Sequence, residues 1–166
     1  MRPSVVSRIT IAFMGHFPTF LIVLFSLLAA SAPRAAETLP GPVPADIVAV
    51  VDGDTLSVRA HIWLGQEVAT LVRLAGIDTP ELKGECESER VRARAAKNFL
   101  ERTVANGPVT LAQIRYEKYA GRVMAKVAAP DGSDLSERMI AAGFARAYDG
   151  GKRLPWCQAA ELAKPE

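Results

Sequence analysis

Three observations predict a five-stranded barrel of the OB type with added helices, in the α+β class. First, five runs of β-branched and apolar residues have the length and the turn boundaries of strands. They are residues 47–51, 55–64, 67–74, 109–114 and 122–128. Second, an apolar four-residue repeat, typical of a long helix, lies between the third and fourth runs. Third, a shorter helical pattern follows the fifth run. This is the order of elements in an OB-type barrel.

The first three strands are expected to form a meander. The turn Asp52-Gly53-Asp54 joins the first two runs, and Leu64-Gly65-Gln66 precedes the third. Because short turns of this kind connect neighbouring strands, we place the three strands side by side in chain order.

The long helix is predicted to start near Ser88, a residue type that can cap a helix, and to stop at Asn106-Gly107-Pro108. Val91, Ala95 and Phe99 recur at four-residue steps, and with Ala96, Leu100 and Val104 beside them they mark its apolar face.

A short helix is predicted to open at the capping-box pair Asp134 and Glu137 and to end at Gly143. Residues 144–148 then read as a short extended segment, and the tail after Trp156 has room for little more than one helical turn.

Residues 1–36 resemble an export signal. They contain three arginines and no acid, and residues 9–30 are almost wholly apolar, with small residues after them. The alternative is an uncleaved membrane anchor, because about 20 apolar residues can span a bilayer. We therefore expect an exported protein, periplasmic or secreted, that touches a membrane only if the signal stays uncleaved.

The proline-rich residues 37–45 read as a linker, 46–157 as the folded domain, and 158–166 as a short tail.

The charge balance of the mature chain is nearly neutral. Of the 20 basic residues three lie in the signal, which leaves 17 against 18 acidic residues, a net charge of −1. No general basic field would attract a nucleic acid. A polyanion would therefore need locally placed arginines and a metal ion.

Cys86 and Cys157 are the two cysteines of the chain. In an exported protein they predict a disulfide, and the alternative is two thiols that do not meet. The bridge would close a loop of about 70 residues, worth about 4 kcal/mol in the chain-entropy model.

Several classes of active site are disfavoured by composition. His61 is the single histidine after the signal, and it lies in a strand pattern away from any serine-protease signature. No glycine-rich phosphate loop is present, and two cysteines with one histidine do not make an ordinary zinc site. What remains is oxygen chemistry: carboxylates, a hard cation and arginines.

Two acidic turns are candidates for that chemistry. Asp52 and Asp54 follow the first strand, and Asp78 and Glu81 follow the third. In a meander both turns can meet at one end of the sheet, where a divalent cation would relieve the repulsion of the carboxylates. The alternative for each turn is ordinary turn composition.

Arg73 lies in an apolar strand, and Arg122 opens another after a tight turn. An arginine in such a place needs a carboxylate or phosphate partner. The alternative for both is a structural ion pair with a nearby acid.

Three motifs in this order resemble the staphylococcal nuclease (thermonuclease) family: "VVDGDTLSV" (50–58), "VRLAGIDTPE" (72–81) and "EKYAGRVMA" (117–125). The resemblance covers about residues 47–148. It implies a five-stranded OB-type barrel, so that 46–157 is a nuclease-like domain, and calcium-dependent cleavage of DNA and RNA phosphodiesters.

By motif position, Asp54 and Asp78 resemble the calcium ligands of the family, together with the backbone carbonyl of Thr79. Glu81 resembles the general base that activates or orients the attacking water.

Arg73 and Arg122 resemble the two arginines that bind the phosphate. Tyr119 stands at the position of the motif tyrosine, and Tyr148 resembles a tyrosine beside the nucleotide.

The leading hypothesis is therefore an exported, monomeric, calcium-dependent nuclease acting on DNA or RNA. The alternative is a non-catalytic OB-type module that binds nucleic acid or a protein. The presence of all five charged motif residues favours the enzyme.

Overall fold

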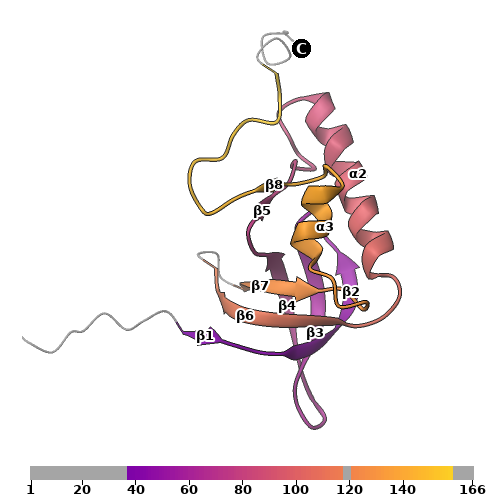
Figure 1. Ribbon diagram of the computed structural model, residues 1–166, viewed down its shortest axis with the longest axis vertical. Coiled ribbons are helices and arrows are strands. Elements are labelled where there is room, and N and C mark those ends of the chain that lie inside the picture. The colour runs from indigo at the N-terminus through magenta and orange to yellow at the C-terminus, as the bar shows by residue number, and fades with distance from the viewer. Residues whose placement is uncertain (1–36, 118–120, 159–166) are drawn as a thin grey trace, which may run out of the picture. The chain divides into compact units, whose positions relative to one another are not determined.

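The computed structural model describes residues 37–117 and 121–158 (Figure 1). The signal predicted for residues 1–36, Tyr119 and nearly all of the tail lie outside these residues. The strands are β1 (Thr38–Leu39), β2 (Val43–Val50), β3 (Thr55–Trp63), β4 (Gln66–Leu74), β5 (Ile77–Asp78), β6 (Val109–Tyr116), β7 (Arg122–Ala128) and β8 (Arg146–Ala147). The helices are α2 (Glu87–Val104) and α3 (Leu135–Ala141). Neither of these helices is long and apolar enough to span a membrane.

Five strands close into a barrel in the order β6-β2-β3-β4-β7, and β7 pairs back with β6. All pairings in this ring are antiparallel except that of β4 with β7, which is parallel. The five predicted strands correspond to β2, β3, β4, β6 and β7, and α2 lies between the third and the fourth of them. The OB-type barrel predicted from the order of elements is confirmed.

The core fills the barrel and continues under the helices. Leu56 and Val58 on β3 and Val72 and Leu74 on β4 are buried at alternate positions, as the two-residue period of strands requires. Side chains of α2 and α3 belong to the same apolar cluster, and the two helices lie side by side over one end of the barrel (Figure 1). Burial of each large aliphatic side chain contributes roughly 1.5–3 kcal/mol.

The structure differs from the linker predicted for residues 37–45. β1 pairs with β6, and Val43, Pro44 and Ala45 form the first part of β2, with Ala45 fully buried. Gly41 explains the composition: a Cβ there would lie 2.5 Å from the carbonyl oxygen of Leu111. The glycine therefore permits close contact with β6, and it does not mark a flexible segment.

Of the two predicted helix N-termini, one is wrong and one is confirmed. Ser88 does not cap α2, because the helix begins at Glu87 with Cys86 as its N-cap. Asp134 caps α3 as predicted: its carboxylate accepts the backbone N–H groups of Ser136 at 2.7 Å and Glu137 at 3.2 Å.

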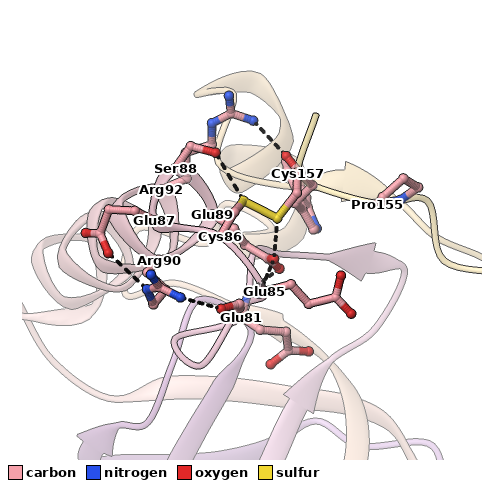
Figure 2. Close-up of a disulfide and its surroundings, with 12 residues drawn as sticks. Glu81, Glu85, Cys86, Glu87, Ser88, Glu89, Arg90, Arg92, Pro155 and Cys157 are labelled. Carbon is pink, nitrogen blue, oxygen red and sulfur yellow. Dashed lines mark hydrogen bonds and ion pairs between the residues drawn. A yellow bond between two sulfur atoms is a disulfide. The ribbon is translucent and has the colours of Figure 1, made fainter. Parts of the chain in front are cut away.

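The predicted disulfide between Cys86 and Cys157 is present, with 6.0 Å between the Cα atoms. It ties the segment after β8 to the start of α2 (Figure 2). The bridge therefore fixes the end of the described chain beside the loop that carries Glu81.

Replacement of both cysteines by serine is expected to lower the free energy of unfolding by about 4 kcal/mol, because the unfolded chain gains the entropy of an open loop. The bridged residues are 71 apart in sequence. Urea unfolding of the variant and of the oxidised protein measures the difference. Equal midpoints and slopes would contradict this account of the bridge.

Candidate active site

Gly53 brings the two acidic segments into contact. A Cβ on Gly53 would lie 2.9 Å from Thr79 Oγ1 and 3.0 Å from the Ala96 Cβ, closer than side chains normally approach. The φ of Gly53 is not in the left-handed region, so the need for glycine comes from this contact. The turn between β2 and β3 therefore packs directly on the segment that follows β5.

Asp54 and Arg73 form a buried ion pair across β3 and β4. Arg73 Nη1 donates to Asp54 Oδ1 at 3.1 Å, and Nη2 lies 2.8 Å from Oδ2. Asp54 is only 3% exposed and Arg73 6%. The register explains the pair, because Thr55 faces Arg73 directly. The structural ion pair that the sequence left open is thus observed for Arg73.

Burial raises the pKa of Asp54 from 3.8 to about 7. The positive charge of Arg73 and a hydrogen bond from Thr55 lower this pKa, whereas the negative charges of Asp52 and Glu81 raise it further. The effect of Glu81 indicates that its carboxylate lies within electrostatic reach of Asp54. An ionised Asp54 is therefore costly here, and a nearby cation would offset that cost.

Asp78, on β5, is also buried, with 4% of its surface exposed. Trp156 Nε1 donates to its Oδ2 at 3.1 Å, and Arg146 Nη2 lies 3.8 Å from the same oxygen. Arg153 Nε lies 3.1 Å from Oδ1, but no donor among the described residues reaches this buried oxygen with hydrogen-bond geometry. A buried anionic oxygen without a hydrogen bond suits a cation.

Glu81 presents an exposed side chain, 53% accessible, whose Oε1 lies 2.6 Å from Arg153 Nη1. The backbone of Glu81 is fixed by Glu89. Oε1 of Glu89 accepts the Glu81 N–H at 3.2 Å, and Oε2 accepts the Glu85 N–H at 3.1 Å. Glu89 points from the first turn of α2 to this loop, beside the disulfide (Figure 2). The packed loop leaves the carboxylate of Glu81 facing solvent.

Arg122 pairs with Glu117, whose Oε1 accepts from Nη2 at 3.0 Å and whose Oε2 accepts from Nε. The parallel pairing of β4 and β7 places Arg122 opposite Leu71, two residues from Arg73. Because residues two apart on a strand share a face, the two arginines lie on one face of the barrel.

One open cleft of about 680 Å³ joins these groups. Its lining includes four residues predicted from the sequence: Arg73, Glu81, Arg122 and Tyr148. The Tyr148 hydroxyl donates to the Gly151 carbonyl at 2.7 Å. Asp54 and Asp78 are buried and do not line this cleft, and Tyr119 is outside the described part of the chain.

Sequence reasoning missed Arg153, Trp156, Glu89 and Glu117. Burial lowers the pKa of Arg153, whereas its hydrogen bond to Glu81 and the charges of Asp78, Glu81 and Asp54 raise it, and the net shift is upward. Arg153 therefore lies in the field of all three predicted acids. The usable signal was the predicted disulfide, since Arg153 lies four residues before Cys157 and Glu81 lies five residues before Cys86.

The donor set fits a hard divalent cation. Asp54, Asp78 and the Thr79 carbonyl would supply the oxygen ligands that such a cation prefers, and Oδ1 of Asp78 accepts no hydrogen bond from the described residues. The potential ligand atoms of Asp46, His61 and Glu67 lie within 4.8 Å of one another. The sulfurs of Cys86 and Cys157 near Glu89 are joined in the disulfide and offer no thiolate ligand.

Comparison with known proteins supports the resemblance drawn from the motifs. A family model described as "Staphylococcal nuclease homologue" matches residues 71–164, which include Arg73, Asp78, Glu81 and Arg122 but not Asp54. Two proteins named "Uncharacterized endonuclease", from Escherichia coli and Escherichia coli O157:H7, are each 32% identical over 103 residues. The match covers 62% of this chain and 60% of each relative, so the chain spans less than two thirds of their length.

The carboxyl carbon of Asp54 is expected to titrate near pH 7 in ¹³C NMR when a chelator keeps cations from competing with the proton. Asp52→Asn should lower the midpoint, because it removes a negative charge that raises the pKa. In the unfolded chain Asp54 ionises near pH 3.8. The contribution of Asp54 to the free energy of unfolding is therefore fully present below pH 3.8 and is lost as the pH rises through about 7. A midpoint below pH 5 in the unsubstituted protein would contradict the burial argument.

Proposed function

The chain belongs to the family of staphylococcal nuclease homologues, and from this premise we propose that it is a calcium-dependent nuclease that hydrolyses phosphodiester bonds of DNA or RNA. The observation that carries the proposal is one cleft in which Arg73, Arg122 and the exposed carboxylate of Glu81 face the same space. Two buried acids contact arginines that line this cleft: Asp54 pairs with Arg73, and Asp78 lies against Arg153. Two arginines that can bind an anion, a carboxylate that can act as a base, and a candidate cation site are thus neighbours.

Asp54, Asp78 and the carbonyl of Thr79 would hold the calcium ion. When bound, a hard cation supplies charge neutralisation and Lewis acidity toward a phosphoryl oxygen. The high pKa of Asp54 and the unsatisfied Oδ1 of Asp78 support this assignment, because both indicate negative charge that the protein alone does not fully stabilise.

Arg73 and Arg122 bind the phosphate and stabilise its growing charge. A planar guanidinium pairs with two phosphate oxygens at once, and the pairing strengthens as negative charge builds in the transition state. Asp54 forms an ion pair with Arg73, and Glu117 forms one with Arg122. These pairs hold both guanidinium groups at the cleft before substrate arrives, so that little reorganisation remains.

Glu81 accepts the proton of the attacking water. Its carboxylate is exposed to the cleft while the buried acids serve as ligands, so it is the nearby acid that can exchange a proton with water. Glu89 holds its backbone at the edge of the cleft. Tyr148 lines the same cleft and would contact the nucleotide, as the resemblance implies.

We further propose that the protein acts as a monomer after export, in the periplasm or outside the cell. The Cys86–Cys157 bridge supports export, because disulfides persist in oxidising compartments.

Digestion of plasmid DNA and of RNA by the purified protein tests the function. We expect cleavage with calcium, none with a chelator, and a loss of at least ~10²-fold for Glu81→Gln, since an amide cannot take the proton. Glu85→Gln is the matched control: it removes the same charge from an exposed position in the same loop and should cut at the wild-type rate. Binding without cleavage would favour the non-catalytic module, and equal rates for Glu81→Gln and wild type would exclude Glu81 as the base.

A further inference from the structure

Arg153 occupies the oxygens that the proposed reaction needs. Its Nε lies 3.1 Å from Oδ1 of Asp78, and its Nη1 lies 2.6 Å from Oε1 of Glu81. One guanidinium thus bridges the proposed calcium ligand and the proposed base. The side chain is 43% exposed, so it can leave this position for solvent without crossing the core.

The segment that carries Arg153 is held at the site at three points. The backbone N–H of Tyr148 donates to the Gly76 carbonyl at 2.9 Å, and Trp156 Nε1 donates to Asp78 Oδ2 at 3.1 Å. The Cys86–Cys157 bridge fixes the far end. A guanidinium on such a segment stays close to the acids even when its own contacts break, which raises its effective concentration there.

We propose that Arg153 competes with the divalent cation for the oxygens of Asp78 and Glu81 and thereby sets the cation concentration at which the active site fills. The inference rests on the proposed function. Two positive charges cannot share Oδ1 of Asp78 at contact distance without strong repulsion. Cation binding therefore requires the guanidinium to move away. The affinity of the site for the cation is reduced by the free energy of the ion pairs that Arg153 must break.

Calcium titration by calorimetry, on the purified oxidised full-length protein without nucleic acid, tests this proposal. Arg153→Gln is expected to bind calcium about tenfold or more tightly than wild type, the size of effect that a neighbouring charge has on the affinity of a carboxylate for a proton. Arg153→Lys keeps the charge and should remain closer to wild type. Arg94→Gln removes an equal charge from an exposed position on α2 and should change the affinity less than about twofold.

Asp78→Asn distinguishes failure of the competition by Arg153 from failure of the calcium site on which that competition rests. If Asp78→Asn abolishes calcium binding while Arg153→Gln binds no more tightly than wild type, competition is refuted and the calcium site stands. If no variant, wild type included, binds calcium, the calcium site itself is refuted and the competition with it. Circular dichroism of each variant confirms that it is folded, and Arg153→Lys provides the comparison should Arg153→Gln unfold.

Discussion

The contact between Gly53 and Thr79 is the constraint on which the site depends. A turn between β2 and β3 and a segment after β5 come from different parts of the chain, and any side chain at position 53 would force them apart. Asp54 and Asp78, which are next in the chain to the two residues in contact, are both buried. The hairpin register and the parallel β4–β7 pairing then place Arg73 and Arg122 on one face of the barrel. The position of the charges therefore follows from the closure of the barrel.

Electrostatic balance gives this arrangement its chemical character. Buried charges are stable only when paired, and removal of one partner typically costs about 3–5 kcal/mol. Asp54 has Arg73, whereas Asp78 has Trp156 and the more exposed Arg153. The first pair is enclosed, whereas the side chain of Arg153 is 43% exposed and can move into solvent. A site of this kind can exist with either a guanidinium or a metal ion at Asp78.

Sequence was sufficient for the barrel and for most of the charged residues, because both depend on local patterns and on short motifs. It failed where distant segments meet. The glycine of the Asp-Gly-Asp turn suggested turn geometry alone, and its real role is contact with Thr79. The prolines of residues 37–45 suggested a linker, but this segment pairs with β6. Arg153 and Trp156 lie beyond the motifs, and the β5–β8 pairing together with the disulfide brings them back to the acids.

A crystal structure of the protein soaked in a calcium or lanthanide salt, with the ion located by anomalous scattering, is the most direct test of the central claim. The account predicts an ion about 2.3–2.6 Å from oxygens of both Asp54 and Asp78, with the guanidinium of Arg153 withdrawn from Asp78. An ion bound solely at the exposed group of Asp46, His61 and Glu67, with Arg153 still against Asp78, would contradict it.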